Sequence, residues 1–266
     1  MRPVIAKVSD IKKIKKDVYL FSFHAPRIAK KAVPGQFVHI KIAPRLILRR
    51  PFSVHYVKGQ MVFILFRIRG RGTQALSRYK KGDNLDVLGP LGNGFNLTGP
   101  GKYACQIIIA GGMGVAPLRF LADVIDKGRD KKAARARFAF IGAKNRQDIL
   151  CAGDFKSAGF KVMAATEDGS LGFKGNVAGL LKKEISLLKR EGRGKVYACG
   201  PFAMFYELEK ILGGITGLAC EFSFEQFMGC GAGICHGCVI ETASGYKRVC
   251  KEGPVFNIND IIWREE

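Results

Sequence analysis

The sequence predicts a multidomain α+β protein with an antiparallel β-barrel domain, a parallel α/β domain and a small cysteine-rich tail. In the first hundred residues, short runs of β-branched and aromatic residues alternate with turn residues. From about Gly101, buried strands alternate with amphipathic helices. The last fifty residues carry five of the eight cysteines and show little regular pattern. We place the domains at residues 1–99, 100–215 and 216–266.

The first domain contains five stretches with the composition of strands. Turn residues such as Pro34-Gly35 and Lys58-Gly59 separate them. Several short strands at this spacing favour a small antiparallel barrel. The expected strands are residues 18–25, 36–42, 51–57, 60–68 and 85–90, and one short helix is expected at 75–83.

The second domain combines buried strands with helices, which predicts a parallel sheet. Asn176 is expected to cap the later helix, and Gly192 is expected to end it. The expected strands are residues 106–112, 136–143, 160–168 and 195–201, and the expected helices are 115–128 and 176–192.

The chain of 266 residues has a formal charge of +22 and a sequence pI near 9.9. Residues 1–200 hold 39 Lys and Arg against 13 Asp and Glu, whereas residues 201–266 hold 5 against 9. This charge indicates either a solvated basic surface or a nucleic-acid-binding protein. No apolar run approaches the roughly 20 residues of a membrane span. Its first residues, MRPVIAKVSD, lack the apolar core of a secretory signal, so we expect a soluble cytoplasmic protein.

Four of the tail cysteines have the spacing of an iron–sulfur site. They follow the pattern C-x4-C-x2-C, and eleven further residues precede the fourth cysteine. This is the plant-type [2Fe–2S] spacing, in which four thiolates hold two irons. Neighbouring glycines allow the tight loop that brings the sulfurs together. The predicted cluster ligands are Cys230, Cys235, Cys238 and Cys250.

A structural zinc site and plain buried thiols are the alternatives for these cysteines. Zinc usually takes two C-x2–4-C pairs, and only Cys235 and Cys238 form one here. Mixed ligation by His and Cys needs two histidines on one iron, so His236 is expected to be a bystander. Cys220 is expected to be an ordinary apolar residue.

Two glycine-containing segments of the α/β domain have the features of a nucleotide site. Residues 107–117, IIIAGGMGVAP, combine a strand, a glycine turn and a helix start. Gly111, Gly112 and Gly114 leave room for a pyrophosphate at the helix N-terminus, although such turns also simply join strands to helices. Cys199, Gly200 and Pro201 end the last strand, at the sheet edge where ligands gather, although Cys199 also suits a small buried position.

The first domain has one segment suited to a flavin or phosphate. Within Arg50-Pro51-Phe52-Ser53, the arginine is able to pair with a phosphate and the strand with a flat heterocycle. Arg67, Gly72 and Thr73 offer another cation and an amide-rich turn. The alternative is that these arginines are merely solvated.

Together these motifs resemble the ferredoxin-reductase-like family, which pairs an FAD-binding barrel with an NAD(P)-binding α/β domain. The resemblance rests on PGQF (34–37), RPFS (50–53), GRGT (70–73), GPLGNGF (89–95), AGGMGVAP (110–117) and ACGP (198–201). With the tail MGCGAGICHGCV…RVCKEGPVF (228–256), the chain looks like the electron-transfer subunits of class 1B dihydroorotate dehydrogenases.

This resemblance implies roles for the residues named above. Arg50, Pro51, Phe52 and Ser53 would hold FAD, Leu65, Phe66 and Arg67 would line it, and Gly72 and Thr73 would bind its pyrophosphate. Gly111, Gly112, Gly114, Cys199, Gly200 and Pro201 would form the NAD site. Two departures stand out: Phe52 replaces a tyrosine that is frequent in the wider family, and the loop before Cys250 is somewhat short.

The implied function is electron transfer without a proton-transfer catalyst in this chain. An FMN-containing catalytic subunit that oxidises dihydroorotate would pass electrons through the cluster and FAD to NAD⁺, in a heterotetramer of two subunit types. A flavin/iron–sulfur subunit of a ferredoxin:NADP⁺ oxidoreductase, sulfide dehydrogenase or hydrogenase is the alternative within the same chemistry. A nucleic-acid-binding protein with structural zinc is the alternative from another class. NAD is expected by resemblance, although NADP sites commonly add an arginine for the 2′-phosphate and the basic residues Lys144 and Arg146 come just after a predicted strand.

Overall fold

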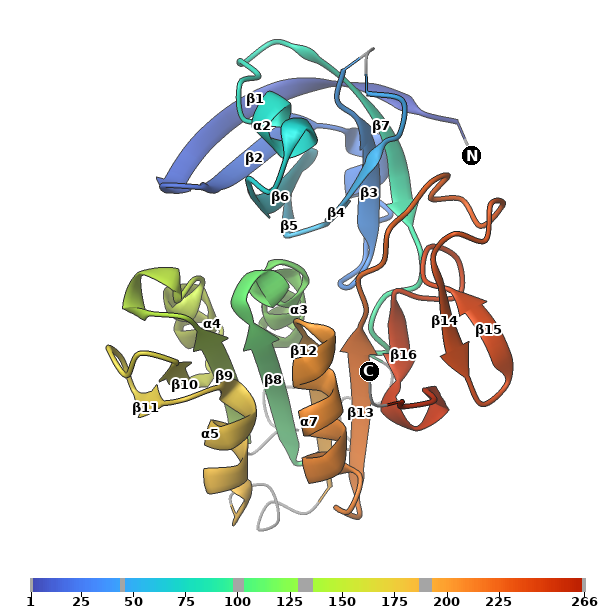
Figure 1. Ribbon diagram of the computed structural model, residues 1–266. Coiled ribbons are helices and arrows are strands. Elements are labelled where there is room, and N and C mark those ends of the chain that lie inside the picture. The colour runs from blue at the N-terminus through green and yellow to red at the C-terminus, as the bar shows by residue number, and fades with distance from the viewer. Residues whose placement is uncertain (1, 44–45, 98–102, 129–135, 187–192, 265–266) are drawn as a thin grey trace. The chain divides into compact units, whose positions relative to one another are not determined.

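The computed structural model describes residues 2–43, 46–97, 103–128, 136–186 and 193–264 (Figure 1). The chain forms two compact units. The antiparallel unit comprises Met1–Gly94, Glu225–Ile240 and Tyr246–Pro254, and the α/β unit comprises Phe95–Phe224, Glu241–Gly245 and Val255–Glu266. The predicted fold class is confirmed, because an antiparallel sheet and a largely parallel sheet follow one another along the chain.

The antiparallel unit is built on seven strands in the order β4-β3-β7-β1-β2-β6-β5. Although β4 and β6 are not neighbours in this order, the rings of Phe52 on β4 and Phe66 on β6 are 5.7 Å apart. The sheet therefore curls around a shared core, as the barrel prediction requires. Its elements are β1 (Val4–Lys15), β2 (Val18–His24), α1 (Pro26–Ala29), β3 (Phe37–Lys41), β4 (Arg50–Ser53), β5 (Tyr56–Lys58), β6 (Met61–Arg67), α2 (Arg71–Leu76) and β7 (Asn84–Leu91).

Two predicted elements of this unit are wrong. The single strand expected at 51–57 is split into β4, which pairs with β3, and β5, which pairs with β6. The helix expected at 75–83 instead runs over Arg71–Leu76. Its start is set by the Thr73 hydroxyl, which accepts hydrogen bonds from the backbone N–H groups of Arg69 and Gly70. Beyond it, the Asp83 carboxylate accepts the Lys80 N–H and stabilises a turn, so the helix does not continue.

The α/β unit contains a second seven-stranded sheet, in the order β11-β10-β9-β8-β12-β13-β16. All of its neighbouring strands are parallel except β16, which runs antiparallel to β13. Every residue of β12, an interior strand of this sheet, is buried. Its elements are β8 (Cys105–Gly111), α3 (Val115–Lys127), β9 (Ala136–Ala143), α4 (Ala152–Ser157), β10 (Lys161–Thr166), β11 (Phe173–Lys174), α5 (Val177–Lys183), β12 (Gly194–Cys199), α7 (Phe202–Leu212), β13 (Leu218–Ser223) and β16 (Val255–Asn257).

Two details of the later segments bear on the predictions. The Asn176 side chain caps α5 by accepting the Gly179 N–H at 2.8 Å, as predicted, whereas Gly192 lies outside the described residues. The tail is more regular than expected, because β13 and β16 extend the large sheet and a two-stranded sheet joins β14 (Val239–Thr242) to β15 (Gly245–Arg248).

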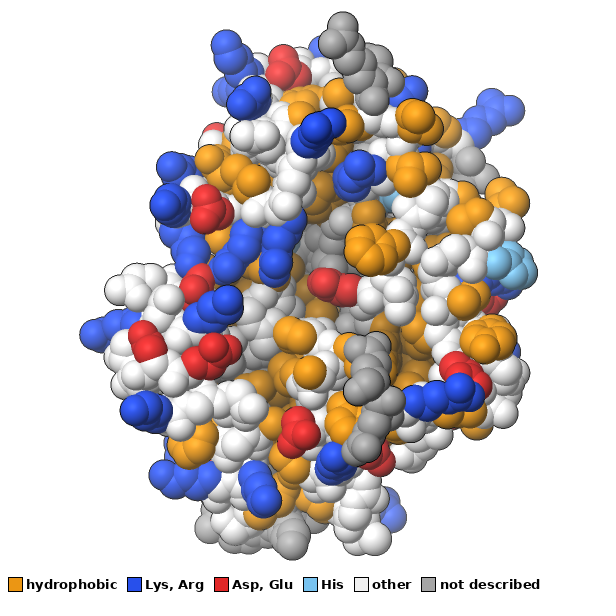
Figure 2. Space-filling model, in the orientation of Figure 1, with side chains coloured by type: hydrophobic (Ala, Val, Ile, Leu, Met, Phe, Trp, Pro, Cys, Tyr) orange, Lys and Arg blue, Asp and Glu red, His pale blue; other side chains and the backbone are white. Residues whose placement is uncertain are grey.

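The surface is rich in basic side chains. In the view of Figure 2, Lys and Arg lie over much of the face, and Asp and Glu are far fewer. Within the described ranges, no helix is both long and apolar enough to cross a membrane.

A buried ion pair stabilises the α/β unit. Lys195 on β12 and Glu221 on β13 lie 3.1 Å apart, with side chains only 4% and 15% exposed. Both also bind the backbone of Asn96: Lys195 donates to its carbonyl at 2.6 Å, and Glu221 accepts its N–H at 3.0 Å. The pair thus ties the segment before β8 to the sheet.

We expect Lys195→Met to lower the free energy of unfolding by about 3 kcal/mol, because it leaves a buried carboxylate without its cation. Thermal or denaturant unfolding of the purified protein measures this loss. The double variant Lys195→Met/Glu221→Met is expected to be less destabilised than Lys195→Met alone. Equal stability of Lys195→Met and the wild type would contradict the proposed importance of the pair.

Candidate functional site

The four predicted cluster ligands lie together in the antiparallel unit. They approach in two pairs: the thiol of Cys230 interacts with that of Cys235, and the thiol of Cys250 with that of Cys238. Across the described residues, no group of three or more His, Cys, Asp or Glu side chains is arranged to hold a single metal ion. Association in pairs suits a two-iron cluster, in which each iron takes two thiolates.

Backbone N–H groups converge on these sulfurs. The sulfur of Cys230 accepts hydrogen bonds from Ala232, Ile234 and Cys235 at 3.3–3.4 Å, and that of Cys250 accepts one from Gly233 at 3.1 Å. Burial acts to raise the pKa of Cys230, but these N–H groups outweigh it and lower the pKa to about 6. Burial raises the pKa of Cys250 to about 12, with the neighbouring Cys238 adding to the effect.

The donor set therefore fits the predicted cluster. Thiolates are the ligands of iron–sulfur clusters, and N–H groups aimed at sulfur stabilise their negative charge. The exposed thiol of Cys235 lies at the surface, whereas Cys238 and Cys250 are buried. His236, the expected bystander, is exposed and has a ring nitrogen 3.4 Å from the Arg248 guanidinium.

Side chains hold the cluster loop in shape and attach it to the sheet. Arg248 donates to the Gly233 carbonyl at 2.7 Å and binds the Glu252 carboxylate, and this bond to Arg248 lowers the pKa of Glu252 to about 2. Asn93, just after β7, donates to the carbonyls of Lys251 and Glu252 at 3.2 and 3.0 Å. The segment carrying Cys250 is thereby fastened to the end of the antiparallel sheet.

Gly231 is a position where the loop needs glycine. Its φ is +66°, and a Cβ there would stand 2.9 Å from Cε1 of His39 and closer still to Nδ1. We therefore expect Gly231→Ala to reduce bound iron about tenfold. Gly237→Ala is the matched control, because its Cβ would meet only the sulfur of Cys235, at 3.6 Å.

Iron and acid-labile sulfide per chain, determined after anaerobic purification, measure the effect. A normal cluster content in Gly231→Ala would show that the loop tolerates a side chain at this position.

The predicted FAD residues lie on β4, β6 and α2. The Arg50 side chain packs over Gly72, where a Cβ would stand 3.2 Å from Nε, so the structure brings these two residues together. Arg50 also donates to the Leu48 carbonyl at 2.7 Å. The Thr73 hydroxyl is engaged with the backbone of Gly70, which shapes the turn before α2.

The remaining FAD candidates differ in exposure. Phe52 is buried, and its ring packs edge-on against that of Phe66, which is also buried. Leu65 is 7% exposed, while the side chains of Pro51, Ser53 and Arg67 are half-buried. The ring of Phe52 is thus part of the core in this structure. The partly exposed side chains of β4 next to it are those of Pro51 and Ser53.

The predicted NAD residues meet at the carboxyl ends of β8 and β12. A Cβ on Gly114 would overlap the Cys199 carbonyl and stand 2.9 Å from the Gly200 nitrogen. A Cβ on Gly111 would lie 3.0 Å from Pro201. The two segments therefore touch through their backbones, and Gly112 turns between them with φ of +54°. Sequence reasoning missed Met204, whose side chain covers both Gly111 and Gly200.

The loops after β9 and β10 carry a basic and an acidic residue near the carboxyl ends of the strands. These residues are Arg146, after β9, and Asp168, after β10. The Ser170 hydroxyl accepts the Arg146 N–H at 2.8 Å and donates to the Asp168 carboxylate at 2.6 Å. These bonds from Ser170 lower the pKa of Asp168. Lys144 and Arg146, the basic residues noted in the sequence, therefore have the ionised carboxylate of Asp168 in the neighbouring loop.

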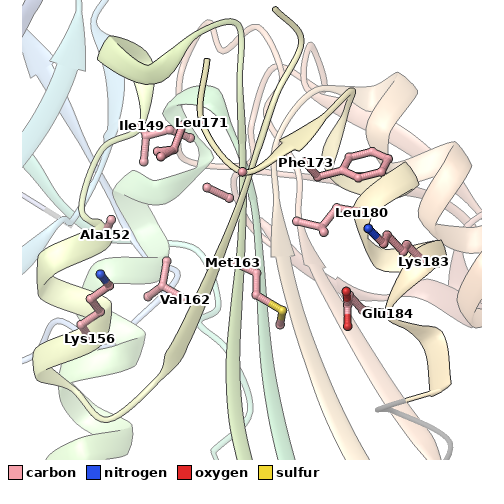
Figure 3. Close-up of a pocket in the computed structure, with 12 residues that line it drawn as sticks. Ile149, Ala152, Lys156, Val162, Met163, Leu171, Phe173, Leu180, Lys183 and Glu184 are labelled. Atoms are coloured by element: carbon pink, nitrogen blue, oxygen red, sulfur yellow. The ribbon is translucent and has the colours of Figure 1, made fainter. Parts of the chain in front are cut away.

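A separate cavity of about 500 Å³ lies in the α/β unit (Figure 3). It is mainly apolar, with Lys156, Lys183 and Glu184 among its lining residues. Val162 and Met163 of β10 line it as well. None of the predicted cofactor residues borders this cavity.

Three known domain families match the chain in order. They are the oxidoreductase FAD-binding domain at residues 5–95, the oxidoreductase NAD-binding domain at 108–210 and the iron–sulfur cluster binding domain of dihydroorotate dehydrogenase B at 225–262. These matches agree with the predicted cofactors FAD, NAD and a [2Fe–2S] cluster.

Two relatives that match nearly the whole chain have the same description. The chain is 39% identical to the electron transfer subunit of dihydroorotate dehydrogenase B (NAD⁺) from Desulforamulus reducens, over 97% of both chains. It is 35% identical to the corresponding subunit of Caldanaerobacter subterraneus, over 97% of this chain and 98% of the relative.

Solved structures show the same fold. An NADH-dependent reduced ferredoxin-NADP oxidoreductase superposes with a TM-score of 0.83 at 26% identity, covering 98% of this chain and 90% of that chain. The cytochrome b5 reductase domain of Ulva prolifera nitrate reductase has a TM-score of 0.69 at 19% identity, covering 84% and 97%.

Proposed function

The chain belongs to the family of dihydroorotate dehydrogenase B electron transfer subunits, and from this membership we propose that it passes electrons from an FMN-containing catalytic subunit, through a [2Fe–2S] cluster and FAD, to NAD⁺ in pyrimidine biosynthesis. The observation that carries the proposal is the set of four thiols, with backbone N–H groups aimed at the sulfurs of Cys230, Cys238 and Cys250, in a chain that also matches FAD- and NAD-binding domains. A basic nucleic-acid-binding protein with structural zinc would also use thiolate ligands, but it has no need of FAD- and NAD-binding domains.

FAD exchanges two electrons with nicotinamide and single electrons with an iron–sulfur cluster, so it supplies the conversion between them. We assign Arg50, Gly72 and Thr73 to the FAD phosphates, and Pro51, Phe52, Ser53, Leu65, Phe66 and Arg67 to the rest of the FAD site. Arg50 contributes a fixed positive charge over Gly72. The strand β4 presents its backbone and the side chain of Ser53 to the flat ring.

In the α/β unit, we assign Gly111, Gly112 and Gly114 to the NAD pyrophosphate, at the start of α3. Cys199, Gly200 and Pro201 orient the nicotinamide end, because they terminate the adjacent strand β12. We assign no acid or base to this subunit. Asp168 favours NAD over NADP, because its ionised carboxylate repels a 2′-phosphate.

We propose that Cys230, Cys235, Cys238 and Cys250 bind the cluster. Cys235 is the exposed ligand and so offers the cluster's access to the partner. We further propose a cytoplasmic complex of two catalytic and two electron transfer subunits.

Co-expression with the FMN-containing catalytic subunit of the same host tests the proposed function. The complex is expected to co-purify and to reduce NAD⁺ when dihydroorotate is added. A complex that reduces a one-electron dye with dihydroorotate but never NAD⁺ would disprove the proposed route. Faster reduction of NADP⁺ from ferredoxin would instead favour a ferredoxin:NADP⁺ oxidoreductase.

A further inference from the structure

His39 is a buried ionisable residue with no place in the function described so far. It lies on β3, and its side chain is completely inaccessible to solvent. Strand β3 pairs with β4 on one side, where His39 stands opposite Pro51 of the predicted FAD segment. On the other side it pairs with β7, where His39 stands opposite Leu88. His39 is therefore one strand away from the proposed flavin residues.

The imidazole also packs against the cluster loop. The ring is so close to Gly231 that a Cβ there would stand 2.9 Å from Cε1 and 3.0 Å from Cγ. Ring nitrogens lie near the backbone carbonyls of Cys230 and Arg49. Cys230 is a proposed cluster ligand, and Arg49 directly precedes β4. The His39 ring thus lies near two backbone carbonyls, that of Cys230 at the cluster site and that of Arg49 at the start of β4.

The chemistry of the ring limits what it is able to do there. Burial, with the charges of Arg49 and Arg50, lowers the pKa of His39 to about 4, so the imidazole is neutral near pH 7. A neutral imidazole has one N–H donor and one acceptor nitrogen. Within the described structure, neither nitrogen reaches full hydrogen-bond geometry. Buried polar groups normally form hydrogen bonds. A leucine at this position would fill the same core without burying nitrogen atoms that lack such bonds.

The position of the ring affects the cluster ligand directly. The Cys230–Gly231 peptide precedes the amides of Ala232, Ile234 and Cys235, which donate to the sulfur of Cys230. Any movement of that peptide moves both this sulfur and its donors. Partners of metal ligands commonly set ligand orientation in this way, and their loss costs about 10–100-fold in metal affinity or activity.

We propose that His39 is a positioning residue for the iron–sulfur cluster: its imidazole, anchored on β3 and packed against Gly231, directs an N–H toward the Cys230–Gly231 peptide and so fixes the place of the Cys230 sulfur. This inference rests on the proposed function, because it requires the cluster to be bound. It adds a residue from the barrel strands, nearly two hundred positions before the cysteines, to the machinery that holds the cluster.

Two substitutions of nearly equal shape test the proposal on the purified full-length holoprotein. His39→Asn keeps an N–H donor near the place of Nδ1, whereas His39→Leu removes the donor but fills similar space. His24→Leu is the matched control, because His24 is exposed on β2 and contacts Gln60 rather than the loop. Val8→Ala, at a buried site on β1, controls for general destabilisation of the unit.

The readouts are the electron paramagnetic resonance spectrum of the dithionite-reduced cluster and the rate of iron release to a ferrous chelator. His39→Leu is expected to shift the spectrum and to release iron about tenfold faster. The rate of iron release is expected to stay within about twofold of the wild-type rate in His39→Asn, His24→Leu and Val8→Ala. This is well below the roughly tenfold effect expected for His39→Leu.

Equal behaviour of His39→Leu and the wild type would overturn the proposal. Equal impairment of His39→Asn and His39→Leu would also overturn it, because ring shape rather than the N–H group would then matter. A wild-type protein without a [2Fe–2S] signal would overturn the proposed function itself, which separates that failure from failure of the inference.

Discussion

Replacing Cys235 by serine is expected to lower dihydroorotate-driven NAD⁺ reduction by about 100-fold or more and to spare reduction of a dye by NADH. Cys235 is a proposed iron ligand, and its sulfur pairs with that of Cys230. Without it, the four-thiolate set that holds two irons is incomplete. The proposed FAD and NAD residues lie on other segments, so electrons from NADH still reach a dye.

The measurement compares both activities in the complex with the catalytic subunit, each normalised to bound FAD. Cys151→Ser is the control, because it makes the same chemical change at a half-buried cysteine of the α/β unit. Equal loss of both activities in Cys235→Ser, with FAD still bound, would contradict the proposed order of cofactors.

Gly114→Ala is expected to lower the reduction of a dye by NADH, the activity that Cys235→Ser spares. A Cβ at this position would overlap the Cys199 carbonyl and stand 2.9 Å from the Gly200 nitrogen, well inside ordinary contact. The loop after β8 must then move by roughly an ångström away from β12, and misplacement on that scale can cost about 100-fold in rate. We therefore expect NADH-dependent dye reduction to fall by about that factor, with FAD and the cluster still bound.

Stopped-flow reduction of the flavin by NADH measures this loss, and the visible spectrum checks cofactor content. Gly153→Ala on α4 is the matched control, because its Cβ would meet nothing within 4 Å. Unchanged flavin reduction by NADH in Gly114→Ala would mean that the nicotinamide nucleotide binds elsewhere.

Much of the candidate site was predictable because its residues are close in sequence or lie at regular positions in a repeating fold. Three of the four cysteines lie within nine residues, so their spacing alone predicts that the sulfurs meet. Gly111 and Cys199 are far apart in the chain, but each ends a buried strand. Parallel strands bring their carboxyl ends to one edge, so the meeting of these two segments followed from the α/β pattern.

The features that sequence reasoning missed depend on contacts between distant segments. His39 sits in QFVHIKI, where alternation alone predicts one open face of the strand. Instead Phe37, Val38, His39 and Ile40 are all buried, because the cluster loop covers the side that alternation leaves open. No local sequence pattern around residue 39 indicates that the cluster loop packs against this strand.

Strand β1 was missed for a related reason. Its last residues, IKKIK, have no clean alternation of apolar and polar residues. The strand forms through pairing with both β2 and β7, and irregular register between Val8 and Asp10 and between Lys13 and Lys15 accommodates the mixed pattern. Pairing with β7 joins segments about eighty residues apart, which local composition does not reveal.

Anaerobic titration of the purified chain with NADH tests the central claim most directly. The claim is that one polypeptide binds FAD and a [2Fe–2S] cluster and transfers electrons between NADH and the cluster. We predict that NADH bleaches the flavin absorbance and that a paramagnetic signal from the reduced cluster appears in the same sample. A colourless protein that contains zinc, or a flavin reduced by NADH beside a cluster that stays oxidised, would contradict it.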